Sequence, residues 1–292
     1  MKLDNKNLET LPSFLVQALN QAGKDRGINQ AVLTLSRSLI TPFLQFCSDR
    51  ALRELAYVAW TKRGANEGDR NNVKLAYETL KLRAQMAKIL GYASYSHYKL
   101  DTEMASSPEN VDKLLTTVWG PARKAAIKDE AILSSLMRQD GIGDTLRAWD
   151  WRFYAERRRL RDYDLNEENV KPFFQLDNLI NATFKCASEL FGLEFSPLDV
   201  PLYHDDCRAW TVSRKGENIA VFIGDYFSRP SKRSGAWCNA MRSQAKFPTK
   251  QIPIVVNVCN FSKVDNFLLS FEDAKTLFHE FGHALHQILS DV

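Results

Sequence analysis

Two histidines flank a glutamate near the C-terminal end of the sequence, in His279-Glu280-Phe-Gly-His283. Residues four apart lie one turn apart on the same side of a helix, so both imidazoles can point at one metal ion. Glu280 is rotated by about 100° from His279, beside the metal rather than on it. Zinc accepts two imidazoles and a third protein ligand, and keeps a position open for water. The metal lowers the pKa of that water, and a carboxylate can pass its proton to a leaving amine, as in a metallopeptidase.

The residues around this motif predict the helix on which the geometry depends. Ser270 is a suitable N-cap, and Asp273 follows three residues later as in a capping box. A strand-like apolar run, 252–259, precedes the helix. Glycine in a helix interior is less stable than alanine by up to about 1 kcal/mol, so Gly282 needs a reason for its presence there. We expect that it allows close approach of another backbone. This context favours a zinc site over a chance match to a short pattern. One buried face is indicated by apolar residues at helical spacing: Phe271, Ala274, Phe278, Phe281, Leu285 and Ile288.

A third histidine, His286, lies on the same helix face but is not predicted to be a ligand. It is seven residues from His279, about 10 Å along the helix axis, which is too far for one tetrahedral centre. The longer pattern H-E-x-x-H-x-x-G-x-x-H also fails, because position 286 is histidine and position 289 is leucine. The third ligand is therefore not supplied by this helix.

The stretch Phe278–His286 resembles the signature of the thimet oligopeptidase family of zinc peptidases. The likeness runs from about position 40 to the end and is strongest to the bacterial peptidyl-dipeptidases, with oligopeptidase A next. The resemblance implies zinc-dependent hydrolysis of short peptides, with His279 and His283 as ligands and Glu280 as general base and then general acid. It also implies a helical half that narrows the channel and excludes folded proteins. The other segments that carry it are 82–92, 104–108, 149–156, 203–206, 224–237 and 258–261.

The same resemblance implies groups that this sequence does not contain. The family's third zinc ligand is a glutamate about two dozen residues beyond the second histidine. The sequence stops at Val292, nine residues after His283. The resemblance also implies residues that bind the tetrahedral intermediate, which are expected downstream of this sequence. It further implies a large N-terminal helical portion, which this sequence does not contain. We therefore expect an internal portion of a longer peptidase. The alternative is a catalytically inactive helical fragment or interaction module that retains only part of the zinc site.

The apolar patterns predict a mainly α protein with a small β-sheet, an α+β fold that is zincin-like at its C-terminal end. Residues 1–192 are predicted to form a helical region, and 193–292 a partial catalytic region, incomplete at the C-terminus. A hairpin is predicted over 208–223 and a basic loop over 228–250. The strand at 252–259 is expected to be open and to pair with an extended substrate backbone.

Two helices in the first region have clear boundary signals. The pattern from Asn72 to Leu90 predicts a strong helix, and Gly91 is placed as its C-terminal stop. Ser107 and Pro108 predict the start of another helix, with proline at the first helical position. A further helix is predicted to open at Thr41-Pro42 and to continue past residue 50.

Two charged clusters offer other functions, and both are interpreted as structural. Arg157–Arg161 is the run that a nucleic-acid binder would use, but the net charge of +4 is mild for 292 residues. We favour a solvated helix face paired with Glu156, Asp162 and nearby carboxylates, and rank the nucleic-acid binder last. His204 with Asp205 and Asp206 makes a poor chelate, because adjacent residues on a strand point to opposite faces.

The five cysteines are scattered and form no C-x-x-C pair, which favours a reducing cytoplasm over a disulfide framework. No run approaches the eighteen apolar residues of a membrane span, and the first residues show no apolar signal core. We expect a cytoplasmic location and short peptides as partners, without nucleic acid or membrane. The patterns leave open the oligomeric state and the choice between dipeptidyl carboxypeptidase and endo-oligopeptidase action.

Overall fold

The computed structural model describes residues 1–292 apart from 144, 165–166, 230, 234 and 264–266. It is the predicted α+β protein, mainly helical with small sheets. The chain divides into two compact units: Met1–Phe46 with Asp162–Val292, and Cys47–Arg161. Strands of the larger sheet begin at Leu193, where the predicted helical region 1–192 ends. The predicted domain boundary between residues 192 and 193 stays a prediction.

The first unit begins with a small layer of two strands and three helices. β1 (Lys2–Leu3) and β2 (Ala31–Val32) pair antiparallel, with α1 (Asn5–Leu8) and α2 (Ser13–Lys24) between them. The helix predicted to open at Thr41-Pro42 starts earlier, as α3 (Arg37–Phe46), and contains Pro42. It ends before residue 50, so the prediction of one continuous helix is wrong.

A five-stranded sheet forms the centre of the first unit. Its order is β3-β4-β5-β7-β6, with β5 and β7 parallel and the other neighbours antiparallel. The predicted hairpin is confirmed, and its two turn residues, Lys215 and Gly216, both have positive φ, as a tight turn requires. The strands are β3 (Leu193–Pro197), β4 (Arg208–Arg214), β5 (Glu217–Phe227), β6 (Trp237–Arg242) and β7 (Ile254–Phe261).

The strand order corrects two predictions. The strand predicted at 252–259 is β7, and it lies inside the sheet between β5 and β6, so it is not open to substrate. The segment 228–250, predicted as a loop, contains β6, which is the edge strand beside β7. Every residue of β6 is at least partly exposed. Its sequence lacks the clear apolar alternation that marks a strand with one buried face, so the pattern did not predict a strand there.

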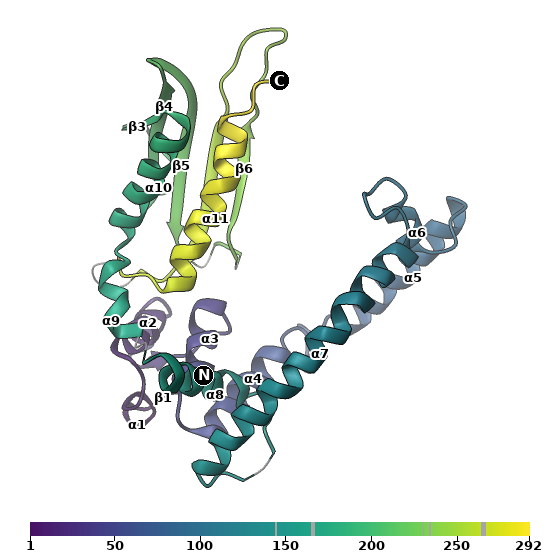
Figure 1. Ribbon diagram of the computed structural model, residues 1–292, viewed down its shortest axis with the longest axis vertical. Helices are drawn as coiled ribbons and strands as arrows, with labels where there is room; N and C mark the ends of the chain where they lie inside the picture. Colours follow the sequence, from purple (N-terminus) through teal and green to yellow (C-terminus); the bar gives the residue numbers. More distant parts are fainter. Residues whose placement is uncertain (144, 165–166, 230, 234, 264–266) are drawn as a thin grey trace. The chain divides into compact units, whose positions relative to one another are not determined.

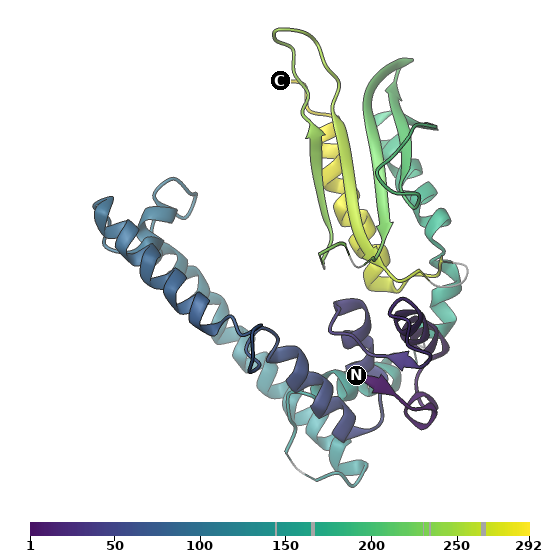
Figure 2. The ribbon, with the colours of Figure 1, turned by 180° about the vertical axis from the view of Figure 1, so that it is seen from behind.

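Helices α10 (Leu176–Phe191) and α11 (Phe271–Ile288) cover one face of this sheet (Figures 1 and 2). Two short segments precede α10, namely α9 (Glu167–Val170) and the 3₁₀ helix η1 (Lys171–Phe173). The core between helices and sheet is aromatic. The ring of Phe184 on α10 stacks on that of Phe195, with centroids 4.1 Å apart, and Phe281 of α11 packs beside both. Burial of these rings helps to hold α11 on the sheet.

The second unit is helical. Gly91 has φ 83° and stops α5 as predicted, with the amide of Tyr92 donating to the carbonyl of Ala87. Ser107 caps α7 and Pro108 is its first residue, also as predicted. The short helix α6 contacts both α5 and α7. The helices are α4 (Arg50–Thr61), α5 (Val73–Ile89), α6 (Tyr95–Leu100), α7 (Pro108–Gln139) and most of α8 (Trp151–Tyr163).

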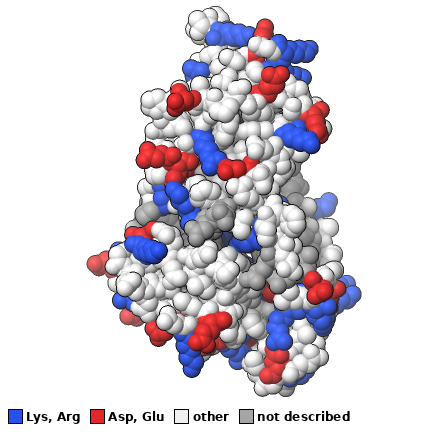
Figure 3. Space-filling view, turned by 90° about the vertical axis from the view of Figure 1, so that its left-hand side faces the viewer, with Lys and Arg blue, Asp and Glu red and all other residues white. Residues whose placement is uncertain are grey.

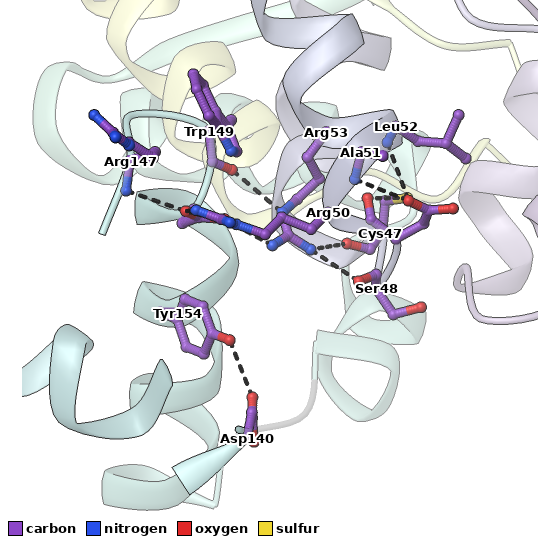
Figure 4. Close-up of polar contacts among 12 residues, drawn as sticks. Cys47, Ser48, Arg50, Ala51, Leu52, Arg53, Asp140, Arg147, Trp149 and Tyr154 are labelled. Carbon is purple, nitrogen blue, oxygen red and sulfur yellow. Dashed lines mark hydrogen bonds and ion pairs between the residues drawn. The ribbon is translucent and has the colours of Figure 1, made fainter. Parts of the chain in front are cut away.

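A buried charge network ties the start of α4 to the start of α8. Arg53 and Asp150 are fully buried, and Nη2 of Arg53 lies 2.9 Å from a carboxylate oxygen of Asp150. Arg50 lies beside Arg53 and donates to the other oxygen at 2.9 Å (Figure 4). Arg53 also donates to the carbonyls of Cys47 and Ser48. Burial alone would raise the pKa of Asp150, but the hydrogen bonds from both arginines outweigh it and hold the pKa below its ordinary value.

The arginine run on α8 is paired, as the solvated-face interpretation predicts. Arg159 pairs with Glu156, Arg158 donates to Asp129 at 2.7 Å, and Arg157 pairs with a carboxylate at the end of α7. On the face that Figure 3 shows, positive and negative side chains are interspersed rather than gathered in one stripe. Among the described helices, none is both long enough and apolar enough to cross a membrane.

Replacing Arg53 with methionine tests the buried network. The substitution removes one partner of a fully buried pair, so we expect the free energy of unfolding to fall by about 3 kcal/mol or more. Urea unfolding followed by circular dichroism measures it. Arg50→Met is the matched control, because Arg50 is 35% exposed and its loss leaves the Arg53–Asp150 pair intact. Equal losses in the two variants would contradict the assignment of Arg53 as the dominant partner.

Candidate metal centre

The helix that carries the two histidines begins with the predicted capping box. The amide of Asp273 donates to Oγ of Ser270 at 3.1 Å, and the amide of Ser270 donates to the carboxylate of Asp273 at 3.2 Å. Both otherwise unpaired N–H groups are therefore satisfied. Glu272 and Asp273 place negative charge in the first turn, which the helix dipole favours. The N-terminal end of α11 is thus fixed by its own sequence.

His279 and His283 point toward one another from the exposed face of α11. Their Nε2 atoms lie 3.2 Å apart and their ring centroids 4.8 Å apart. Two Zn–N bonds of 2.0–2.1 Å at a tetrahedral angle place the nitrogens about 3.3 Å apart. The pair therefore fits two ligands of one zinc ion. Within the described part of the chain, no third histidine, cysteine, aspartate or glutamate joins them, and His286 is not part of such a group.

Glu280 lies at the flank of the helix, between the histidine face and the sheet. Its side chain is only 8% exposed. Helix α11 packs against β6 and β7, and the negative charge of Glu280 contributes to the raised pKa of the thiols of Cys238 on β6 and Cys259 on β7. Burial, with a contribution from Glu280, raises the pKa of Cys238 to about 12 and that of Cys259 well above its ordinary value. Neither thiol is a nucleophile at neutral pH.

A buried asparagine beside these thiols was not predicted from the sequence. Asn257 is fully buried on β7, directly opposite Cys238 in the strand register. Its Nδ2 has no hydrogen-bond partner among the described residues. An asparagine in the middle of an otherwise apolar strand was the signal that could have drawn attention to it, because buried amides are normally paired.

A second buried charge network anchors the connection that leads to the edge strand β6. Asp225, at the end of β5, is 1% exposed and accepts two hydrogen bonds from Arg229, at 2.7 and 2.8 Å. Lys232 lies 3.2 Å from the same carboxylate and donates to the carbonyl of Phe227 at 2.8 Å. The hydroxyl of Tyr203 donates to Asp225 at 3.0 Å. Together these contacts tie the residues before β6 to the end of the sheet.

Two further predictions concern the cluster at residues 204–206 and the glycine at position 282. Nδ1 of His204 accepts a hydrogen bond from the amide of Asp206 at 3.1 Å, and the carboxylate of Asp206 pairs with Lys263. These contacts fit the structural role predicted for that cluster. A Cβ on Gly282 would meet no described atom within 4 Å, so the close backbone expected there is not found in the described part of the chain.

Asp225→Asn tests the second network through its pH dependence. Burial alone would raise the pKa of Asp225, but the hydrogen bond from Arg229 and the charge of Lys232 outweigh it, so the folded-state pKa lies below 3.8. The stabilisation is therefore fully present above the unfolded pKa of about 4 and is lost as the pH falls through the folded pKa. At pH 7 we expect the variant to be about 2 kcal/mol less stable. Urea unfolding measures the difference.

The difference in the free energy of unfolding between wild type and Asp225→Asn should shrink as the pH is lowered below 4. Asp291→Asn is the control, because Asp291 is 81% exposed and its pairing with Lys246 is solvated. A stability difference that does not change with pH would show that Asp225 acts by packing rather than by charge.

Comparison of the sequence with known proteins identifies a family. Residues 43–292, which are 250 of the 292, match peptidase family M3. The chain is 35% identical over 279 residues to dipeptidyl carboxypeptidase of Escherichia coli (strain K12), covering 92% of this chain and 40% of the relative. It is 34% identical over 311 residues to a probable cytosolic oligopeptidase A of Arabidopsis thaliana, covering 98% and 44%.

Oligopeptidase A of Escherichia coli (strain K12) is 29% identical over 300 residues, covering 99% of this chain and 44% of the relative. The chain thus spans less than half the length of these relatives. The resemblance noted in the sequence is confirmed, and with most of its residues matched the chain belongs to peptidase family M3.

Proposed function

We propose that this chain contributes the histidine pair and the general base of a zinc-dependent peptidase that hydrolyses short peptides. The observation that carries the proposal is the 3.2 Å separation of the two Nε2 atoms on a capped helix. Membership of peptidase family M3 supports it. The names of the relatives, a dipeptidyl carboxypeptidase and oligopeptidases, support short peptides as the substrate class. The scattered cysteines support a reducing compartment such as the cytoplasm.

His279 and His283 would hold the zinc ion. Zinc bound there supplies Lewis acidity, which polarises the scissile carbonyl and lowers the pKa of a water molecule. Glu280 accepts a proton from the attacking water as the new C–O bond forms. It then delivers this proton to the leaving nitrogen as the C–N bond breaks. Because Glu280 is nearly buried, its side chain has little freedom to move.

The edge strand β6 is the best-placed element to hold a substrate. It lies beside β7, and α11 packs against both strands. An extended peptide that pairs with the outer edge of β6 would gain main-chain hydrogen bonds that do not depend on its sequence. Such pairing supports broad sequence tolerance for short peptides. The role first expected for residues 252–259 therefore passes to β6.

One observation favours an alternative function for the isolated chain. No third protein ligand joins the histidine pair among the described residues. Alone, the chain would then be a catalytically inactive helical fragment or interaction module that holds half of a zinc site. The alternative concerns the isolated chain and is compatible with its family.

Zinc binding by the purified chain distinguishes these possibilities. Two imidazoles without a third ligand should hold zinc weakly, and a mild chelator should remove it. His279→Ala or His283→Ala should abolish the remaining binding, whereas His286→Ala should not change it. Titration against a competing chelator measures the affinity. Tight one-to-one binding would contradict a two-ligand site in this chain, and equal loss with His286→Ala would contradict the ligand assignment.

Glu280→Gln tests the general base in an enzyme completed by the remaining segments of an M3 relative. We expect zinc content to be retained and turnover to fall by about 10²–10⁴-fold, because glutamine cannot accept the proton. Metal analysis and hydrolysis of a short fluorogenic peptide measure the two quantities. Normal turnover in this variant would rule out the role of Glu280.

A further inference from the structure

We propose that Asn257 is a positioning residue for Glu280: its side-chain amide turns toward the carboxylate, donates a hydrogen bond to it and holds it in place for proton transfer. The proposal rests on the proposed function, because it concerns the general base of the same site. It is carried by an unpaired buried amide on β7, by the sheet face on which that amide lies and by the stripe of α11 that covers this face.

The side-chain amide of Asn257 is buried without a full set of partners among the described residues. Its Oδ1 accepts a hydrogen bond from the thiol of Cys259 at 3.5 Å, but its Nδ2 has no partner in the described part of the chain. Buried amides are normally paired, and an unpaired donor lowers the stability of the fold. The terminal torsion of asparagine has a broad minimum, so the amide can turn toward an acceptor without a change in the backbone.

Asn257 lies on the face of the sheet that the helices cover. Successive side chains of a strand point to opposite faces, so Asn257 shares a face with Val255 and Cys259. These two residues belong to the core that also contains the buried residues of α10 and α11. Val256 and Val258 belong to a separate apolar cluster. The unpaired amide therefore lies between β7 and the helices.

A stripe of α11 passes over the same strand positions. Glu280, Ala284 and Gln287 fall within an arc of about 60° on the helix. Ala284 is fully buried in the core, and Nε2 of Gln287 donates to Sγ of Cys238 at 4.0 Å. Cys238 is directly opposite Asn257 in the strand register. The stripe that begins with Glu280 thus faces the part of the sheet that contains the unpaired amide.

Glu280 is the charged acceptor on this stripe. After burial, its charge is the largest contribution to the raised pKa of the thiols of Cys238 and Cys259. One thiol lies opposite Asn257 and the other two residues beyond it, so the carboxylate shares the surroundings of the amide. Hydrogen bonds to an ionised acceptor are about twice as strong as those between neutral groups. The carboxylate is therefore the acceptor toward which the amide is expected to turn.

Two neutral oxygens on the same face are the rival acceptors. One is the side-chain oxygen of Gln287. The other is the hydroxyl of Tyr226, which is buried on β5 with its ring packed over Gly224. Gly224 is the register partner of Asn257 on that strand. Both oxygens would form weaker bonds than a carboxylate, and each can be removed by a single substitution.

A double-mutant cycle in the chain itself tests the contact without any measurement of activity. Asn257→Leu removes the donor and Glu280→Met the acceptor, with little change in side-chain shape. We expect Asn257→Leu to lower the folding equilibrium constant about tenfold more in wild type than in the Glu280→Met background, because a hydrogen bond to a charged group couples its partners by this order. Urea unfolding measures all four proteins. If Asn257→Leu does not fold, Asn257→Ala takes its place in the cycle.

The matched controls are the same cycle with Gln287→Leu and with Tyr226→Phe in place of Glu280→Met. We expect no coupling to Asn257 in either control. Absence of coupling between Asn257 and Glu280 would overturn the proposal. Coupling confined to Gln287 or Tyr226 would identify a neutral acceptor and would overturn it as well.

Turnover in an enzyme completed by the remaining segments of an M3 relative separates positioning from a structural role. Asn257→Leu should lower kcat about tenfold and leave KM and zinc affinity unchanged, because a misplaced base affects the chemical step. In the Glu280→Gln background the same substitution should cause no further loss. A loss of the same size in both backgrounds would assign Asn257 a structural role and overturn the proposal.

The two levels of the argument fail in different ways. Full turnover in Glu280→Gln would refute the proposed function and the positioning role with it. Wild-type kcat in Asn257→Leu, in an enzyme that requires Glu280, would overturn the positioning role alone.

Discussion

The packing of Phe281 against the aromatic core fixes the rotation of α11 about its axis, and the candidate site depends on that rotation. The ring lies 5.5 Å from that of Phe222 on the sheet and 5.7 Å from that of Phe184 on α10. With this face held inward, the positions of His279 and His283 fall on the opposite side, about 160–200° away. Glu280 falls between the two, which explains why its side chain is almost buried while the histidines are exposed. One hydrophobic contact thus separates the proposed ligands, on the exposed face, from the proposed base, at the flank of the helix.

Each unit also contains a buried aspartate held by two cations. Asp150 is paired with Arg50 and Arg53, and Asp225 with Arg229 and Lys232. A single cation rarely offsets the desolvation of a buried carboxylate, so the second cation and the backbone donors decide the balance. In both cases the pKa of the carboxylate lies below its ordinary value, although burial alone would raise it. The first network joins segments about 100 residues apart in sequence, whereas the cations of the second lie only four and seven residues beyond Asp225.

The sequence predicted those features whose causes are local. The capping box at Ser270, the stop at Gly91 and the hairpin are each encoded within a few residues, and all three are confirmed. The edge position of β6 and the interior position of β7 depend on pairing between segments far apart, which periodicity does not report. The apolar residues of α5 show the same limit. They predicted the helix correctly, yet Leu75 and Ile89 are 66% and 85% exposed, because burial depends on a partner as well as on spacing.

The placement of both histidines on one capped helix has a thermodynamic consequence for the proposed zinc site. The two histidines are held by a helix that is already folded, so the entropy of ordering them is lost at folding rather than at metal binding. Under the proposed function, any further ligand comes from outside the histidine pair. Zinc then favours the ordering of the residue that brings it, and that ordering favours zinc by the same factor, since binding free energies are reciprocal. A site built in this way links the metal to the assembly of the fold around it.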